Sequence, residues 1–479
     1  MTANTAPSDV ANVEKNGGPP TSLRDWIDRL AAKGRVAITR PGISLEYTLA
    51  AIGKHLDGRK AVLFPRPGGH SMPVVTGVVA TRTWIAESMC VGEDAVLARF
   101  SEAADRPRPC REVTDAPVHA VVHRDGDVAE HLPIPTHHEL DNGPYITAGL
   151  VIARNPKTGA QNVSIHRCQV SGPRRLGVLI LPRHLNAYFA MAEAAKSDLA
   201  VAVVIGVDPL TLLASQAIAP LDCDELEIAS ALHKAPLEVV KCLTNDVRVP
   251  ARAEIVIEGR LLPGVRETEG PFGEFPKYYG SRSEKPVIEI DAITHRDDAL
   301  FHTIVPAAME HLLLGGIPRE ATLLAELQRN YPNVRDVHLT TGGVCRYHLN
   351  VKIAKRQKGE AKNVILAALA GHYDIKRVVT VDEDVDVHDR ECVEWAVATR
   401  FQADRDLVVV ANAQGSKLDP SSDQGVGAKM GLDATVPLDA DQFSFTPIRI
   451  PGESDIDVTA EIFDEEARDW RARLRTAES

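Results

Sequence analysis

The chain lacks the cysteine pattern of a disulfide-rich or zinc-binding protein. Its seven cysteines stand at positions 90, 110, 168, 223, 242, 345 and 392, and no two of them have C-x-x-C spacing. An odd number of scattered cysteines builds neither a disulfide framework nor a zinc knuckle. We therefore expect reduced thiols and a cytoplasmic location.

Long hydrophobic runs are also missing. Apolar stretches such as residues 199–207 are far shorter than the roughly 20 residues that a membrane-spanning helix needs. The N-terminus is polar and has neither the basic start nor the apolar core of a signal peptide. The sequence therefore predicts no membrane segment.

Positive charge is in deficit, and the common nucleotide fingerprints are absent. Lys and Arg number 54 against 66 Asp and Glu, a net charge of −12 that disfavours a nucleic-acid partner. The pairs Gly315-Gly316 and Gly342-Gly343 match neither a P-loop nor G-x-G-x-x-G, and no serine stands in a G-x-S-x-G elbow. The sequence therefore does not favour dinucleotide binding or serine hydrolysis.

What is present is a chain long enough for several domains. At about 150 residues per domain, 479 residues suggest two to four. Residues 1–21, which include Gly-Gly-Pro-Pro, are expected to form a disordered lead-in. Ser22 is then predicted to cap a helix with one apolar face. Helical and strand-like segments follow to about 115, so residues 22–115 are predicted to form an N-terminal α/β domain.

The second region, residues 116–318, is dominated by short strands. The main predicted strands are 146–154, 162–170, 176–181, 253–261 and 287–293, with an Ala-rich helix at 184–196. Short strands separated by turns favour a barrel-like sheet carrying α/β insertions.

The third region, residues 319–479, returns to alternating helices and strands. The predicted helices are 319–330, 362–371 and 391–400, and the predicted strands are 335–339, 346–353, 375–381 and 406–411. This alternation is typical of an α/β domain. A charged stretch at 462–474 is predicted to be an amphipathic C-terminal helix. The expected fold class is thus multi-domain α/β, of the mixed α+β kind.

Two segments carry chemistry. On a strand, Asn162, Ser164 and His166 would share one face, and Arg167 would fall on the opposite, apolar face. An arginine that is buried on an apolar face is costly unless it is paired with a carboxylate. The alternative interpretation is that this strand is an exposed edge, where Arg167 simply reaches water.

The second segment, Glu267 to Glu274, could supply that carboxylate. Gly270, Pro271 and Gly273 exclude a stable helix and fix a bent loop, which presents Glu269 and Glu274. Paired acids can divide their roles, one ionised against a cation and the other held protonated by burial. A surface turn with two solvated glutamates is the alternative interpretation.

Together these segments resemble the UbiD family of reversible decarboxylases. Asn-x-Ser-Ile-x-Arg is followed about a hundred residues later by Glu-Gly-Pro-Phe-Gly-Glu, and the stretches 236–246, 253–259 and 429–435 are similar to that family as well. The likeness covers about residues 22–455. It implies a split-β-barrel flavin-binding domain and a C-terminal α/β domain that forms homodimers or homohexamers.

The resemblance also implies cofactors. The family uses prenylated FMN, supplied by a flavin prenyltransferase, together with Mn²⁺ (or Mg²⁺) and K⁺. Its metal ligands match Asn162, His184 and Glu225, and Lys429 matches a lysine that contacts the cofactor phosphate. Potassium would bind backbone carbonyls near Ala214, Ser215 and Ala217, with Glu225 shared. The full set of implied cofactor-binding residues is Asn162, Ser164, Ile165, Arg167, Arg183, His184, Glu225 and Lys429.

The implied catalytic residues are Arg167, Glu269 and Glu274. Arg167 would pair with an ionised Glu269 and hold the substrate carboxylate in a bidentate manner. Glu274 would donate the proton that replaces CO₂, so burial should raise its pKa. Decarboxylation is the default direction, because carboxylation is uphill at ordinary CO₂ concentrations.

The substrate pocket is expected to include Phe275, His311 and Leu432. His311 lies in 309–318, at the expected junction of the second and third domains, which is a common place for a pocket. A polar wall residue favours an aromatic or heteroaromatic acid over an α,β-unsaturated acid of the acrylic or cinnamic type. Two alternatives of another class stay open, an NAD(P)H-flavin reductase and a non-catalytic subunit of a decarboxylase complex.

Overall fold

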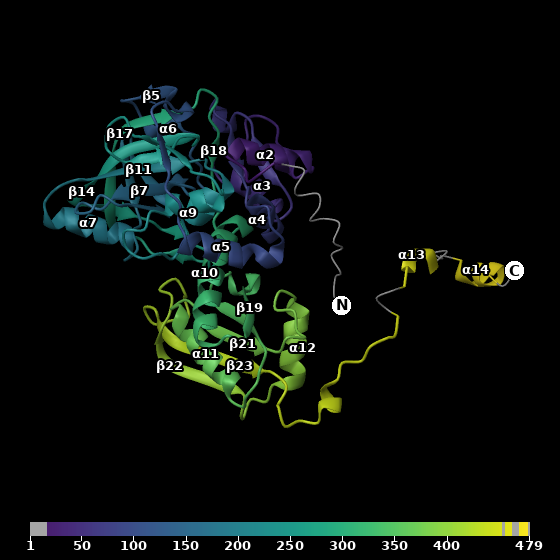
Figure 1. Cartoon of the computed structure of the whole chain (residues 1–479). Helices are drawn as coiled ribbons and strands as arrows, with labels where there is room; N and C mark the ends of the chain where they lie inside the picture. The colour runs from purple at the N-terminus through teal and green to yellow at the C-terminus, as the bar shows by residue number, and fades with distance from the viewer. Residues whose placement is uncertain (1–16, 453–455, 462–468, 478–479) are drawn as a thin grey trace. The chain divides into compact units, whose positions relative to one another are not determined.

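The computed structural model describes residues 17–452, 456–461 and 469–477 (Figure 1). The chain divides into two compact units, residues 1–435 and 436–479. The predicted lead-in lies mostly outside the described residues, as does the first part of the predicted helix at 462–474, whose described end belongs to α14 (Trp470–Ala477). None of the described helices combines the length and apolarity needed to cross a membrane.

The N-terminal region is a small α/β layer. As predicted, Ser22 caps the first helix, α2 (Leu23–Ala32), where its hydroxyl accepts the Asp25 amide hydrogen at 3.2 Å. The other helices are α3 (Thr48–His55), α4 (Arg82–Met89) and α5 (Val96–Asp105). The four-stranded sheet has the order β1 (Val36–Ile38), β2 (Ala61–Phe64), β3 (Val74–Thr76) and β18 (Phe301–His302), so its last strand comes from the central region.

The central region is built on a nine-stranded sheet. Its strands are β5 (Val121–His123), β6 (Tyr145–Ile146), β7 (Leu150–Arg154), β8 (Gln161–Ile165), β9 (Cys168–Gly172), β10 (Arg175–Val178), β11 (Leu199–Ile205), β14 (Ile255–Glu269) and β17 (Ser283–His295). The order is β6-β9-β10-β17-β14-β11-β7-β8, with β5 paired to β17. The predicted hairpin at 155–160 joins β7 to β8 in antiparallel register.

The expectation of one continuous strand from 162 to 170 is wrong. The chain leaves its partner β7 after Ile165 and pairs next with β6 and β10 from Cys168 onward. His166 and Arg167 stand at this change of partner, and the His166 amide donates to the Gly149 carbonyl at 3.1 Å. Arg167 is therefore placed at a break in the sheet, between the ends of two strands.

Shorter elements surround this sheet. The helices are α7 (His184–Ala194), α8 (Pro209–Ala214) and α9 (Glu225–Leu232), and a small sheet contains β4 (Arg111–Val113), β12 (Glu238–Lys241) and β13 (Arg248–Pro250). Helices α7 and α9 both contact β8, so the first residues of both helices, His184 and Glu225, can approach Asn162 on that strand.

A long helix, α10 (Met309–Asn330), begins ten residues before the predicted helix start at 319 and contains Pro318. Proline normally disfavours a helix interior. Here burial of Leu312, Leu313 and Ile317 against the core favours the helix in spite of it. The helix therefore continues through the expected domain boundary at 318.

The C-terminal region carries a five-stranded sheet. The strands, in sheet order, are β19 (Val334–Leu339), β20 (His348–Ile353), β21 (Arg377–Val381), β23 (Val426–Ala434) and β22 (Leu407–Gln414), and the helices are α11 (Glu360–Gly371) and α12 (Arg390–Arg400). Strand β23, which carries Lys429 and Leu432, was not predicted. The mixed, multi-domain α/β architecture agrees with the predicted fold class.

Candidate active site

The two segments singled out in the sequence meet at Arg167. Its Nε and Nη2 donate to the two carboxylate oxygens of Glu269 at 2.9 and 2.8 Å. Glu269, the last residue of β14, is fully buried, and the Arg167 side chain is 9 % exposed. The predicted Arg167–Glu269 pair is thus formed, through two hydrogen bonds, and the surface-turn alternative does not hold for Glu269.

The third predicted catalytic group, Glu274, is bound to Arg167 as well. Arg167 Nη1 donates a hydrogen bond to its carboxylate. Glu274 is 8 % exposed. Burial raises the pKa of Glu274; the Arg167 charge opposes this shift, and the Glu269 charge adds to it. One guanidinium therefore bridges two carboxylates, and the second of them is biased toward its protonated form.

The loop that carries Glu274 is anchored by backbone hydrogen bonds. The Gly273 amide donates to Asp141 at 2.8 Å, and the Gly270 amide donates to the Gln169 side-chain oxygen at 3.1 Å. Tyr145 donates to the same Gln169 oxygen at 3.0 Å. These contacts hold the residue after Glu269 against strand β9 and the residue before Glu274 against the segment that precedes β6.

The predicted metal ligands come together as well. Asn162 donates from Nδ2 to Glu225 at 2.9 Å, and His184 Nδ1 lies 3.8 Å from the same Glu225 oxygen. The Val163 amide fixes the other Glu225 oxygen at 2.6 Å. The described residues contain no group of three His, Cys, Asp or Glu side chains placed to bind a metal, but here the third donor is an amide. Amide, imidazole and carboxylate donors fit a hard or borderline divalent cation.

The other implied cofactor-binding residues lie around this trio. The Ser164 hydroxyl is 2.8 Å from His166 Nε2, Ile165 packs on the main core, and the exposed Arg183 stands at the N-terminus of α7. Ala214, Ser215 and Ala217 lie at the end of α8, and the Ala214 carbonyl already accepts the Ala217 amide hydrogen. Potassium binding at this loop stays a prediction.

Lys429 is buried, and its amino group is occupied by backbone carbonyls. Nζ donates to the carbonyls of Leu369 at 3.0 Å, Tyr373 at 3.1 Å and His372 at 3.4 Å, at the C-terminal end of α11. Burial lowers the pKa of Lys429. Its contact with a cofactor phosphate stays a prediction.

Sequence reasoning missed two arginines, of which Arg346 is buried and Arg319 is partly buried. Arg319 on α10 has no hydrogen-bond partner for Nε or Nη1, and its Nη2 lies 3.6 Å from Asp374; burial, followed by the Arg346 charge, lowers its pKa to about 9. Arg346 is 7 % exposed and, among the described residues, has no carboxylate within 4.0 Å. Burial also lowers the pKa of Arg346. Neither residue belongs to a local motif, so no pattern marks it as buried.

These arginines belong to a cationic cluster that surrounds His372. Its members are Arg183, Arg319, Arg346 and Lys429. His372 has an unpartnered Nε2, and its pKa is lowered to about 2 by burial and by the charges of Arg319, Arg183, Arg346 and Lys429. Asp374 is a carboxylate whose charge acts on Arg319, Arg346 and Lys429 alike. Buried positive charge with unused donors fits one or more anionic ligands.

The predicted pocket residues are only partly brought together. The Phe275 ring packs edge-on against His311, with centroids 6.4 Å apart. His311 Nδ1 accepts the Ala307 amide hydrogen at 3.2 Å, and burial lowers the His311 pKa to about 3, so the neutral ring carries its proton on Nε2. Leu432 instead packs against the apolar cluster of Val379 and its neighbours, so the structure does not bring it to Phe275.

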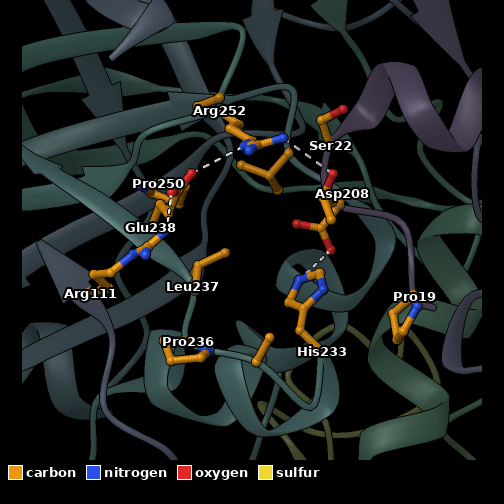
Figure 2. A pocket seen from close by; sticks show the side chains of 14 residues that line it. Pro19, Ser22, Arg111, Asp208, His233, Pro236, Leu237, Glu238, Pro250 and Arg252 are labelled. Atoms are coloured by element: carbon orange, nitrogen blue, oxygen red, sulfur yellow. Dashed lines mark hydrogen bonds and ion pairs between the residues drawn. The ribbon is translucent and has the colours of Figure 1, made fainter. Parts of the chain in front are cut away.

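A separate cavity of about 210 Å³ lies outside this set of residues (Figure 2). His233 is paired with Asp208 at 3.0 Å, and Glu238 is paired with both Arg111 and Arg252. The charged groups that line this cavity therefore already have partners, whereas Arg319 and His372 of the cationic cluster keep nitrogen atoms without a hydrogen-bond partner.

Comparison with known proteins identifies the family of this chain. Three family models match: the 3-octaprenyl-4-hydroxybenzoate carboxy-lyase N-terminal domain at residues 27–104, the Rift-related domain at 111–309 and the C-terminal domain at 312–434. An anhydromevalonate phosphate decarboxylase from Methanothermobacter thermautotrophicus is 42 % identical over 87 % of this chain and 97 % of its own length.

Solved structures are similar over nearly the whole chain. The UbiD-class enzyme HmfF from Pelotomaculum thermopropionicum, in complex with FMN, is 52 % identical with a TM-score of 0.91, covering 92 % of this chain and 100 % of its own. An evolved dimeric form of HmfF was solved in complex with prFMN. A 3,4-dihydroxybenzoic acid decarboxylase from Enterobacter cloacae is 29 % identical with a TM-score of 0.87, covering 92 % of this chain and 99 % of its own. The chain belongs to the UbiD family of carboxy-lyases and is a UbiD-class decarboxylase.

Proposed function

We propose that the chain is a prenylated-FMN-dependent decarboxylase of an aromatic or heteroaromatic acid. The observation that carries this proposal is the Arg167 guanidinium bound to both Glu269 and Glu274, with the pKa of Glu274 raised by burial. A positioned cation and a protonated acid are what a non-oxidative decarboxylase needs on the substrate side. The solved relatives bound to FMN and prFMN support the cofactor assignment.

The residues present fit such a cofactor. Asn162, His184 and Glu225 would hold a divalent metal, and Arg183 and Lys429 would supply positive charge for the cofactor phosphate. The chemistry that prenylated FMN supplies when bound is covalent capture of the substrate carbon and storage of the electron pair left behind by CO₂.

The chain's own groups would then orient the acid and move the proton. Arg167, held by Glu269, presents its guanidinium to the substrate carboxylate. After CO₂ leaves, Glu274 donates its proton from the carboxyl oxygen to the product carbon and becomes ionised next to Arg167, which stabilises the charge. The Phe272 ring, 4.9 Å from the Arg167 guanidinium carbon, excludes water from the ion pairs.

The cationic cluster refines the substrate class. We infer that the acid carries a second negatively charged group, because Arg319 retains two unused donors and, among the described residues, its charge is faced by Asp374 alone of the carboxylates that act on it. Several relatives are named for a phosphate-bearing substrate, anhydromevalonate phosphate, which supports an anion distant from the reacting carboxylate. An unsaturated acid of this kind is the second candidate.

The test is a substrate screen with protein co-produced with a flavin prenyltransferase. Benzoate, benzene dicarboxylates, furan and pyrrole carboxylates and phosphorylated unsaturated acids are compared by CO₂ release and product chromatography. We expect turnover of an aromatic or heteroaromatic acid, abolished in Glu274→Gln and retained in Glu267→Gln, whose ion pair with Arg175 lies at the surface. Flavin-loaded protein that releases CO₂ from none of these acids, or equally well with Glu274→Gln, would refute the proposal.

Two further predictions remain part of this proposal. We expect an assembly of two or six chains, and loading of the cofactor only when the prenyltransferase is present. Mass photometry and the absorption spectrum of the purified protein measure these directly.

A further inference from the structure

Arg346 reaches its buried position through a gap in a neighbouring helix. A Cβ atom added at Gly315 on α10 would lie 1.7 Å from Arg346 Nη2 and 2.5 Å from its guanidinium carbon. The arginine therefore occupies the space that any other residue at 315 would fill. Gly315, whose pair with Gly316 matched no nucleotide motif, has a steric reason in this contact.

The turn that delivers Arg346 is strained. Val344 and Cys345 both have positive φ, +53° and +51°, and they directly follow the pair Gly342-Gly343. Two adjacent non-glycine residues in the left-handed region are uncommon, and one of them is β-branched. Strain of this kind persists where the surrounding structure requires one geometry, and here it fixes the start of the Arg346 side chain.

The guanidinium connects α10 to the residue after the proton donor. Arg346 Nη1 donates to the carbonyls of Leu312 and Cys345 at 3.0 and 2.9 Å. Its guanidinium carbon lies 5.3 Å from the centroid of the Phe275 ring, a cation–π arrangement. The Tyr347 ring packs edge-on against Phe275 as well, with centroids 5.6 Å apart.

Phe275 and Gly273 flank Glu274 on either side. Gly273 is fixed by its hydrogen bond to Asp141, which belongs to the central region, whereas Phe275 is held by Arg346 and Tyr347, which precede strand β20. Between them the Glu274 amide donates to the Tyr278 carbonyl and the Lys277 amide to the Glu274 carbonyl, both at 2.9 Å. The loop is thus clamped at both neighbours of the acid.

We propose that Arg346 is a positioning residue that holds Phe275, and with it Glu274, in place, and that Gly315 exists to admit it. The effect on the reaction rests on the proposed function, but the clamp itself does not. Loss of the clamp frees the 273–278 loop and lets water reach Glu274.

The first test is hydrogen exchange on the full chain without cofactor. The variants are Arg346→Met, which keeps the apolar stem but removes the cation, and Gly315→Ala, which leaves Arg346 intact but fills its gap. Gly342→Ala is the matched control, because a Cβ there meets nothing within 4 Å and its φ is not positive. Alanine favours a helix over glycine, so Gly315→Ala should fold.

We expect the amides of residues 273–278 to exchange about 5- to 30-fold faster in Arg346→Met and Gly315→Ala. This is the equilibrium factor that corresponds to the free energy of a lost buried cation–π contact. Exchange in Gly342→Ala should equal that of the unmodified chain. Unchanged protection of this loop in both Arg346→Met and Gly315→Ala would overturn the proposal.

The second test is the pH profile of kcat in cofactor-loaded enzyme. Because burial raises the pKa of Glu274, a loosened loop should move the high-pH limb to lower pH and reduce kcat by about tenfold or more. A merely structural role would lower the amount of active enzyme without moving the limb, and that result would count against Arg346 as a positioning residue. If the loop loosens but no variant and no parent chain decarboxylates any acid, the proposed function fails and the clamp stands.

Discussion

Replacing Glu269 by glutamine tests the electrostatic arrangement of the candidate active site. The side chains have almost the same shape, so the substitution removes a charge and converts one acceptor into an NH₂ group. Glu269 is fully buried and accepts both short hydrogen bonds from Arg167, at 2.9 and 2.8 Å. In Glu269→Gln the new side-chain NH₂ group faces an N–H group of Arg167. Both groups are donors, so one of the two hydrogen bonds is lost.

The expected cost in the free energy of unfolding follows from this burial. Breaking a buried ion pair by removing one partner costs about 3–5 kcal/mol, because the remaining charge is left uncompensated. Arg167 still has Glu274 as a carboxylate partner, so the lower end, about 3 kcal/mol, is expected here. Glu267→Gln, two residues away, removes a partly exposed pair with Arg175 and should cost about 0–1 kcal/mol.

The same substitution should change the proton donor. The Glu269 charge contributes to the raised pKa of Glu274, and the Arg167 charge opposes it. Without Glu269 the Arg167 cation acts on Glu274 alone, so the pKa of Glu274 falls. A proton donor works only while it is protonated, and activity should therefore be lost at lower pH than in the unmodified enzyme.

Two measurements check these expectations. Urea denaturation gives the change in the free energy of unfolding, and kcat between pH 5 and 9 gives the position of the high-pH limb. We expect Glu269→Gln to be less stable and its limb to lie at lower pH, while Glu267→Gln matches the unmodified chain in both. A Glu269→Gln enzyme with unchanged stability and an unchanged limb would refute the assignment of Glu269 as the charge that tunes this site.

Three further predictions concern the metal ligands, the cationic cluster and the C-terminal sheet. His184→Ala should weaken Mn²⁺ binding at least about tenfold, the loss that even an outer-shell partner of a ligand causes, as measured by electron paramagnetic resonance of free Mn²⁺. Arg319→Gln should raise KM about tenfold or more for an acid with a second anionic group and leave mono-acids unchanged, since hydrogen bonds to charged groups contribute about 1.5–3 kcal/mol; equal effects on both classes would contradict the cluster's role. Gly431→Ala should lower the free energy of unfolding by about 1–3 kcal/mol in urea denaturation, because its Cβ would lie 2.0 Å from Cγ2 of the buried Ile365, whereas Gly342→Ala should not.

The local elements were predictable where a short-range signal exists. Ser22 was identified as a helix cap because its hydroxyl satisfies an amide of the first turn, and the hairpin at 155–160 was identified from its turn residues. Strand β23 escaped prediction because it mixes glycine, lysine and apolar residues without alternation. Helix α10 was predicted too short because Pro318 marks a boundary locally, while packing of its leucines overrides that signal.

The candidate site divides in the same way. The apolar environment predicted for Arg167 implied that it needs an acid, and the glycine-proline loop implied that Glu269 and Glu274 sit on a bent segment. The sequence by itself thus indicated that Arg167 needs an acid and that Glu269 and Glu274 lie on one bent segment, because burial and backbone freedom act over a few residues. The catalytic roles proposed for these residues rest on the resemblance to the UbiD family. Only the tertiary structure decided that two carboxylates 102 and 107 residues away meet one guanidinium, and that Arg346 is buried and Arg319 is largely covered. The reason is physical: side-chain burial and long-range pairing depend on how distant elements pack, and that packing has no signature within any short stretch of sequence.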